Sequence, residues 1–273
     1  MQPLASSLGA TPTTTPADTC DVDVATVAFF FDLDGTLAPL AARPDAVKLP
    51  RDTASVLARL FERTQGALAV VSGRAIDEID GLLAPLRVPA AGLHGAEIRH
   101  ADGALVRAEG HAVDTTRVTA MVAPLHALVA QHPGLLLENK GSALALHYRS
   151  APELASVARD TMRALADLHA DSFVLQPGKF VFELRPRHVS KGRAITTLLK
   201  ETPFAGRTPL FAGDDLTDEA GFADVNALGG ITIKIGDGET CARHRLPSPE
   251  ALTAWLLTLR HTSPRQPSQE NGV

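Results

Sequence analysis

Cysteine is scarce in this sequence, and its scarcity excludes two kinds of scaffold. Cys20 and Cys241 are the only two cysteines of the 273 residues, and neither belongs to a Cys-x-x-Cys or Cys/His array. Disulfide frameworks and structural zinc sites both depend on such spacings. The sequence therefore predicts neither a disulfide-stapled fold nor a structural zinc site.

Long apolar runs and a basic N-terminus are also missing. No stretch approaches the roughly 18 consecutive apolar residues of a membrane span. Residues 1–24 contain no Lys or Arg and no long apolar run, unlike a signal peptide. Because residues 1–24 and 261–273 are rich in small and polar residues, we expect both to be disordered tails. The expectation is a cytoplasmic protein without a membrane partner.

Net charge and hydrophobic content narrow the classes of protein to which this chain can belong. The formal net charge is −5, from 26 basic and 31 acidic residues, which argues against a general nucleic-acid binder. Hydrophobic residues make up 45% of the chain, enough for a real core. A chain of this length forms one large domain or two modest ones.

Strands and helices alternate in the first and last thirds of the chain. Short apolar runs predict buried strands, and helical periodicity follows most of them. This order favours a parallel, doubly wound sheet, with one hairpin expected over 97–106. The predicted strands are 27–31, 67–71, 209–212 and 231–235, and the predicted helices are 50–63, 76–83, 190–200, 217 onward and 249–259.

The middle of the chain has a different rhythm. Helical stretches at 116–131 and 152–169 are each followed by two short strands. Two copies of helix–strand–strand predict a small α+β domain inserted into the first. We therefore expect a discontinuous core of residues 25–113 and 186–260, with an insert of residues 114–185.

Two carboxylates follow the first predicted strand. The run Phe29-Phe30-Phe31 ends in Asp32-Leu33-Asp34, followed by Gly-Thr. Ligands of open α/β sheets bind at the carboxyl ends of the strands. Two such carboxylates can divide labour, one attacking an electrophile and the other moving a proton. The alternative is a solvated strand end followed by a turn.

A second acidic motif follows the strand predicted at 209–212. Asp214 and Asp215 are the residues expected to hold a metal, because clustered carboxylate oxygens suit Mg²⁺. Asp218 and Glu219 are expected to cap the helix that begins near Thr217, where negative charge is favourable.

Ser72 and Lys191 complete the set. Ser72 follows a predicted strand and Lys191 opens a predicted helix. A hydroxyl with nearby backbone N–H groups suits a phosphate oxygen, and lysine acts on phosphate as a point charge. Taken singly, Ser72 could instead be a helix N-cap and Lys191 an ordinary surface lysine. Their shared location with the acidic motifs favours one common site.

Together these four pieces resemble the four motifs of the haloacid dehalogenase superfamily. The resemblance implies a Rossmann-like core with a C2-type α+β cap. It also implies that Asp32 is a nucleophile, that Asp34 is the general acid and base, and that Ser72 and Lys191 hold the phosphoryl group. The Mg²⁺ would be held by Asp32, the main-chain carbonyl of Asp34 and Asp214, with Asp215 in support.

Other segments are similar to the trehalose-6-phosphate phosphatase family over residues 27–259. That resemblance implies hydrolysis of trehalose 6-phosphate through an aspartyl-phosphate. It places Glu138, Lys140 and Glu183 on the disaccharide and Gly73 and Arg74 at the substrate. Composition alone also allows a hydrated sheet edge at the cap residues. The segments are Gly92–Glu97, Glu138-Asn139-Lys140, His147-Tyr148-Arg149 and Gly178–Pro186.

Several alternatives stay open at this point. Another capped sugar phosphatase would act on sucrose 6-phosphate or mannosyl-3-phosphoglycerate, and a mutase would need a bisphosphate. A non-catalytic sugar-phosphate sensor is disfavoured by the intact catalytic set. Functional pairing with a separate trehalose-phosphate synthase is open, as are the roles of His94, Glu97, His147 and Arg149.

Overall fold

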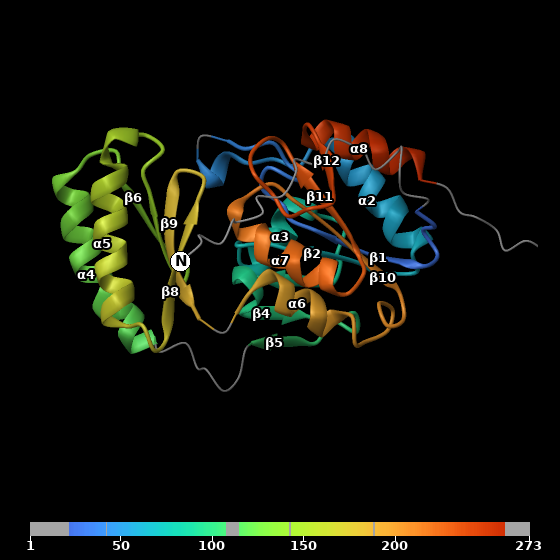
Figure 1. Ribbon diagram of the computed structural model, residues 1–273, viewed down its shortest axis with the longest axis horizontal. Coiled ribbons are helices and arrows are strands. Elements are labelled where there is room, and N and C mark those ends of the chain that lie inside the picture. Colours follow the sequence, from blue (N-terminus) through green and yellow to red (C-terminus); the bar gives the residue numbers. More distant parts are fainter. Residues whose placement is uncertain (1–21, 42, 108–114, 142, 188, 260–273) are drawn as a thin grey trace, which may run out of the picture.

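The computed structural model describes residues 22–259 apart from 42, 108–114, 142 and 188. The predicted tails over 1–21 and 261–273 lie outside the described residues. The chain forms a large lobe and a smaller one, side by side in Figure 1. Each lobe has its own sheet, one of eight strands and one of four.

The large sheet has the strand order β12-β11-β10-β1-β2-β3-β4-β5. Strands β12 through β3 are parallel, and β4 and β5 form the antiparallel hairpin at the edge. The α/β fold with a parallel sheet is confirmed. Its strands are β1 (Val27–Phe31), β2 (Leu68–Val71), β3 (Ala90–Gly92), β4 (Glu97–Arg99), β5 (Leu105–Arg107), β10 (Thr208–Gly213), β11 (Ile231–Ile235) and β12 (His244–Leu246).

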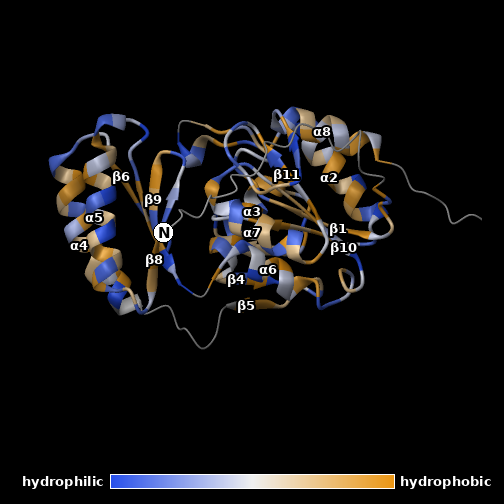
Figure 2. Cartoon of the chain, viewed as in Figure 1, coloured by the Kyte–Doolittle hydropathy of each residue, from blue (hydrophilic) through white to orange (hydrophobic). Residues whose placement is uncertain are grey.

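Strand β1 is buried on both faces, which explains its unbroken apolar sequence. Phe29 and Phe31 face one side and Phe30 the other, because side chains alternate along a strand. Figure 2 shows apolar colouring along the buried strands of this sheet. Fully burying one such phenyl ring contributes about 1.5–3 kcal/mol. The sheet is therefore anchored at β1, the strand that leads into Asp32.

Helices cover both faces of the large sheet. The Phe29 side packs against α2 (Arg51–Arg63), α3 (Ile76–Leu83) and α8 (Pro249–Thr258). The Phe30 side packs against α6 (Lys191–Leu198) and α7 (Leu216–Ala227). This is the doubly wound arrangement that the alternation of elements predicts.

The N-terminal boundary of the core differs from the prediction. Val22 and Val24 lie within the range expected to be a tail, yet both are buried in the core on the Phe29 side of the sheet. Two valines separated by a single aspartate are too short a pattern to identify from sequence. The packed chain therefore includes residue 22.

The small lobe is an antiparallel sheet covered on one face by two helices. Its strand order is β6-β7-β9-β8, and α4 and α5 lie on the side away from the large lobe (Figure 1). Met121, Met162 and Leu184 belong to its separate apolar core. Its elements are α4 (Thr115–Gln131), β6 (Leu136–Asn139), β7 (Leu144–His147), α5 (Ala155–Leu168), β8 (Phe173–Gly178) and β9 (Val181–Pro186).

Three short 3₁₀ helices complete the described elements: η1 (Pro44–Ala46), η2 (Leu93–Gly95) and η3 (Pro152–Leu154). Within the described part of the chain, every helix is too short or too polar to cross a bilayer.

Candidate active site

A cavity of about 340 Å³ lies between the two lobes. That volume is in the range of small-molecule sites, about 300–1,000 Å³. Every residue predicted for the site lines it. From the large lobe these are Asp32, Asp34, Ser72, Gly73, Arg74, Lys191, Asp214 and Asp215, and from the small lobe Glu138, Lys140 and Glu183.

Asp32 lies directly after β1 at the floor of the cavity. Its side chain is buried, and its Oδ1 accepts a hydrogen bond of 2.7 Å from Lys191 Nζ. Burial raises the pKa of Asp32 well above its ordinary value, and the nearby Asp218 and Asp214 raise it further, against the opposing effect of Lys191. The ionised form of this carboxylate therefore needs positive charge around it.

Lys191 is a buried residue, so the alternative of an ordinary surface lysine is wrong. It is the first residue of α6, whose N-cap Ser190 accepts a hydrogen bond from Arg193 N. Its Nζ donates to Asp32 and to Asp218, each at 2.7 Å. Burial disfavours the ammonium, but the two carboxylates outweigh that effect and raise the pKa of Lys191. Lys191 thus stays charged beside Asp32.

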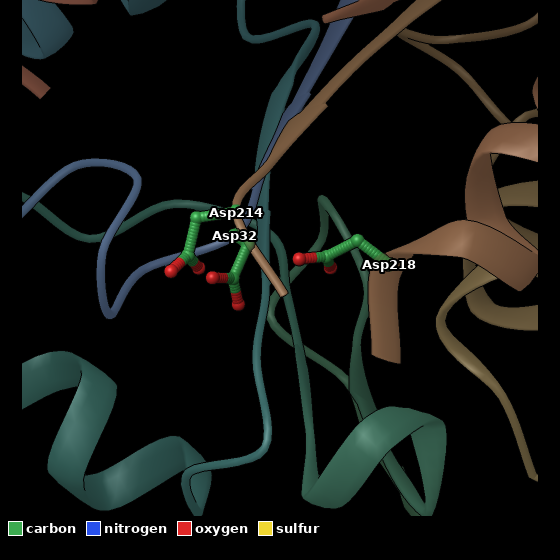
Figure 3. Close-up of side chains that lie close together, drawn as sticks. All are labelled: Asp32, Asp214 and Asp218. Carbon is green, nitrogen blue, oxygen red and sulfur yellow. The ribbon is translucent and has the colours of Figure 1, made fainter. Parts of the chain in front are cut away.

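Three carboxylates converge at this floor. Oxygens of Asp32, Asp214 and Asp218 lie within 4.8 Å of one another, and Figure 3 shows Asp218 pointing toward Asp32 from the start of α7. Asp214 Oδ1 is buried and has no hydrogen-bond partner. Burial and the neighbouring Asp218 and Asp215 raise the pKa of Asp214 to about 7. A buried, unsatisfied carboxylate oxygen among like charges fits a bound divalent cation.

The structure gives Asp215 a capping role that was not predicted, and it gives Asp218 a place in the carboxylate cluster in addition to its predicted capping role. Asp215 is the N-cap of α7, and its Oδ1 accepts from Leu216 N at 2.7 Å. Asp218 joins the three-carboxylate group while its Oδ2 accepts from Asp215 N at 3.0 Å. Asp218 is three residues beyond the N-cap, so its side chain turns back toward the strand ends. Asp215 and Asp218 belong to the same sequence motif, so the sequence does not show which of them reaches Asp32. The direction in which α7 leaves the strand decides it.

Gly35 allows Asp214 to approach the first motif. Its φ of +84° lies in the left-handed region that glycine adopts readily. A Cβ at this position would lie 2.0 Å from Asp214 Oδ2. The glycine after Asp34 therefore provides both the turn and the space for the second acidic motif.

The carboxylate of Asp34 is held by the guanidinium of Arg74. Arg74 Nε and Nη2 donate to the two oxygens of Asp34, both at 2.7 Å, and Nη2 also donates to the carbonyl of Pro44. Bidentate pairs of this kind fix geometry as well as charge. Arg74 lines the cavity as predicted, but its guanidinium is engaged with Asp34.

Ser72 does not cap the following helix, because α3 begins at Ile76 with Ala75 as its N-cap. The Ser72 side chain is buried, and its Oγ accepts from Arg74 N at 3.2 Å. Ser72 therefore shapes a compact loop, Ser72-Gly73-Arg74, directly after β2.

The small lobe brings polar side chains to the opposite wall. Glu183 lies on the interior strand β9 and is buried, so a hydrated sheet edge does not describe it. Lys140 Nζ lies 3.4 Å from Glu183 Oε1 and donates to the carbonyl of Gly73 at 3.0 Å. Glu138, on the edge strand β6, is 2.8 Å from His147 Nε2.

Electrostatics keep Glu183 ionised. Burial alone would raise its pKa, but His94 and Lys140 outweigh burial and lower the pKa of Glu183 to about 2. Burial lowers the pKa of His94, against the effect of Glu183. His94 Nε2 lies 3.0 Å from Glu183 Oε2, where a ring N–H donates to the carboxylate. His94 is thus a site residue whose role the sequence left open, since its partner is 89 positions away.

Comparison with known proteins identifies the family. The family model described as trehalose-phosphatase matches residues 30–248. The chain belongs to the trehalose-phosphatase family. The family prediction from the motifs is confirmed, and the chain is a phosphatase by membership.

Individual relatives agree over almost the whole chain. The trehalose-6-phosphate phosphatase of Escherichia coli K12 is 44% identical over 90% of each chain. A probable trehalose-phosphate phosphatase of Sinorhizobium fredii is 41% identical over 85% of this chain and 87% of its own length.

Solved structures show the same fold. A trehalose-6-phosphate phosphatase related protein is 28% identical with a TM-score of 0.71, covering 85% of this chain and 95% of that one. A second structure is the C-terminal domain of the Candida albicans trehalose-6-phosphate phosphatase. It is 24% identical with a TM-score of 0.79, covering 86% of this chain and 92% of that one.

Proposed function

We propose that this phosphatase hydrolyses trehalose 6-phosphate to trehalose and phosphate through an aspartyl-phosphate on Asp32. The observation that carries the proposal is one cavity whose floor holds Asp32, Lys191 and Asp214 and whose opposite wall holds Glu138, Lys140 and Glu183. The floor suits a phosphoryl group and the wall suits a sugar. The named relatives supply the identity of that sugar phosphate.

The first half of the reaction transfers the phosphoryl group. A carboxylate oxygen of Asp32 forms a bond to phosphorus while the bond from phosphorus to the sugar 6-oxygen breaks. Asp34 donates a proton to the departing oxygen, which leaves as the hydroxyl of trehalose. Lys191 offsets the charge of the transferred group, and the loop of Ser72 and Gly73 holds its oxygens.

The second half releases phosphate. Asp34, now ionised, takes a proton from a water molecule that attacks phosphorus. The bond between phosphorus and Asp32 breaks, which frees the carboxylate and releases inorganic phosphate. Phosphoryl transfer depends mainly on positioning and charge neutralisation, which this buried group of charges provides.

The carboxylate cluster would hold the cation. Asp32, Asp214 and the carbonyl of Asp34 are the proposed ligands, with Asp218 fixing Lys191 beside them and Asp215 in a supporting place. Bound Mg²⁺ would neutralise part of the negative charge on the phosphate and on Asp32. The unpartnered Asp214 Oδ1 supports this assignment.

The small lobe is proposed to be the cap that recognises the sugar, with the predicted bounds 114–185. Carboxylates such as Glu138 and Glu183 accept hydrogen bonds from sugar hydroxyls, and Lys140 donates them. Closing a cap over the site also excludes water from the aspartyl-phosphate.

A trehalose-phosphate synthase is the proposed functional partner. A bifunctional trehalose-6-phosphate synthase/phosphatase of Thermoproteus tenax is 33% identical over 84% of this chain, which spans 31% of that protein. In that relative the two activities share one polypeptide. We propose that a trehalose-phosphate synthase supplies the substrate of this phosphatase. The cytoplasmic location remains a prediction from composition.

The test is the stoichiometry of product release. Purified protein with Mg²⁺ should release trehalose and phosphate from trehalose 6-phosphate in equal amounts, and Asp32→Asn should release neither. Mass spectrometry of acid-quenched wild type should find the phosphoryl group on the peptide containing Asp32. A fully active Asp32→Asn variant would contradict the nucleophile assignment.

A further inference from the structure

Two polar contacts cross the cavity from the small lobe to the large one. Glu183 binds His94 at 3.0 Å, and Lys140 binds the carbonyl of Gly73 at 3.0 Å. Both contacts use the small-lobe residues proposed to recognise the sugar. Both end on the large lobe within or beside the loop proposed to hold phosphate. These two contacts therefore connect the two halves of the proposed substrate site directly.

The backbone around His94 is held in an unfavourable conformation. Leu93, His94 and Gly95 have φ values of +50°, +58° and +106°. Two consecutive non-glycine residues in the left-handed region are strained, and such strain collects at functional sites. Two backbone hydrogen bonds of 2.9 Å fix this turn to the Ser72-Gly73-Arg74 loop. His94 N donates to Ser72 O, and Leu93 N donates to Arg74 O.

The imidazole of His94 lies directly against Gly73. A Cβ on Gly73 would be 2.6 Å from His94 Nε2, so only glycine leaves room for the ring. The ring is buried, with 6% of the residue exposed. In its neutral form the ring carries one N–H, and the Glu183 carboxylate is the acceptor that fixes it on Nε2. The strained turn thus points the N–H of His94 Nε2 at the carboxylate of Glu183.

We propose that His94 is a positioning residue that couples sugar recognition to phosphate binding. It orients Glu183 for a sugar hydroxyl and, through the same turn, holds the Ser72-Gly73-Arg74 loop against the transferred group. This inference rests on the proposed function and deepens it, because it names the large-lobe residue through which the sugar-binding carboxylate acts. His94 acts through Glu183 and does not itself touch the reacting atoms.

Two substitutions separate the hydrogen bond from the turn. His94→Asn keeps a residue that tolerates the left-handed backbone well, but its shorter side chain cannot reach Glu183. His94→Gln suits that backbone less well, but its amide reaches the place of Nε2. If the hydrogen bond matters, Gln retains more activity than Asn. If only the turn matters, Asn is as active as wild type.

The readout is selectivity between two substrates. Trehalose 6-phosphate uses the Glu183 wall, whereas p-nitrophenyl phosphate has no sugar to reach it. We expect His94→Asn to lower kcat/KM for trehalose 6-phosphate at least about tenfold, the loss typical of a hydrogen bond to a charged group. The fall with p-nitrophenyl phosphate should be less than about threefold, since the hydrogen bond that is lost serves the sugar wall.

A double-mutant cycle tests the proposed route through Glu183. In a Glu183→Gln background, His94→Asn should lower kcat/KM for trehalose 6-phosphate by less than about twofold further, because the partner is already altered. His100→Asn is the matched control: His100 Nδ1 also pairs with a carboxylate, Glu201, at 2.7 Å, but away from the cavity. His100→Asn should leave kcat/KM unchanged for both substrates.

The outcomes are distinct. Wild-type activity in His94→Asn, equal losses with both substrates, or additive losses in the cycle would each overturn the positioning role alone. A wild type that does not turn over trehalose 6-phosphate would overturn the proposed function, and with it this inference.

Discussion

The guanidinium of Arg74 binds both carboxylate oxygens of Asp34, each at 2.7 Å. The sequence predicts Arg74 at the substrate and Asp34 as the proton carrier, and the two side chains meet in one ion pair. The pair fixes the direction of the Asp34 carboxylate within the cavity. In the proposed reaction Asp34 protonates the departing sugar oxygen, and Arg74 would set the orientation in which it does so.

We predict that Arg74→Lys lowers kcat for trehalose 6-phosphate about tenfold, because lysine cannot form the two-pronged contact. Asp34→Asn should cost more, about 100-fold or beyond, since general acid–base catalysis is lost. Steady-state kinetics with saturating Mg²⁺ measure both. Arg159→Lys is the control, because Arg159 pairs with Asp160 on the exposed surface of α5. A wild-type kcat in Arg74→Lys would contradict the orienting role.

Asp214 and Asp215 should differ in their effect on metal binding. Asp214→Asn should raise the Mg²⁺ concentration for half-maximal activity at least about tenfold, since hard cations prefer carboxylate oxygens. Asp215→Asn should raise it much less, because Asp215 caps α7. Mg²⁺ should also raise the Tm of wild type more than that of Asp214→Asn. Equal effects of the two substitutions would contradict this difference and would make Asp215 a direct ligand.

Gly73 should not tolerate a methyl group. Gly73→Ala places a Cβ 2.6 Å from His94 Nε2, and relieving that contact should cost about 1–3 kcal/mol of stability and lower phosphatase activity. Gly81→Ala is the matched control, since a Cβ there meets nothing within 4 Å and the residue lies inside α3. It should stabilise the protein by about 0.5–1 kcal/mol. Urea unfolding and phosphate release measure the pair; an active, stable Gly73→Ala would contradict the packing.

Glu183 should contribute stability that acid removes. Burial opposes its ionisation, but His94 and Lys140 lower its pKa from 4.5 to about 2. The folded state thus binds this proton less readily than the unfolded state, so the contribution is present above about pH 4.5 and is lost as pH falls to about 2. The shift corresponds to roughly 3 kcal/mol.

The measurement is the difference in free energy of unfolding between wild type and Glu183→Gln across pH. It should shrink as pH falls from about 5 to 2. Glu153→Gln, at an exposed position in η3, should show a difference near zero throughout. A wild-type advantage that stays constant down to pH 2 would exclude the lowered pKa.

Most of the large sheet could be predicted from the sequence because buried parallel strands read as unbroken apolar runs. The runs before Asp32, Ser72 and Asp214 became β1, β2 and β10. Strands β3 and β12 have three residues each and are too short to show a period. They form because their neighbours β2 and β11 offer hydrogen-bonding edges.

The location of the site also followed from the sequence, since parallel strands bring their carboxyl ends to one edge. The direction of each side chain did not. Asp215 and Asp218 belong to one motif, and the turn of α7 decides which one reaches the cluster. The pairing of His94 with Glu183 joins two lobes across 89 positions, which no local pattern specifies.

The most direct test of the proposed function is a comparison of kcat/KM among sugar phosphates in Mg²⁺. The panel is trehalose 6-phosphate, sucrose 6-phosphate, mannosyl-3-phosphoglycerate and glucose 6-phosphate. The kcat/KM for trehalose 6-phosphate should exceed that for the others by about 100-fold or more, because a poorly matched sugar leaves buried polar groups such as Glu183 unpaired. A higher kcat/KM for sucrose 6-phosphate or mannosyl-3-phosphoglycerate would contradict it.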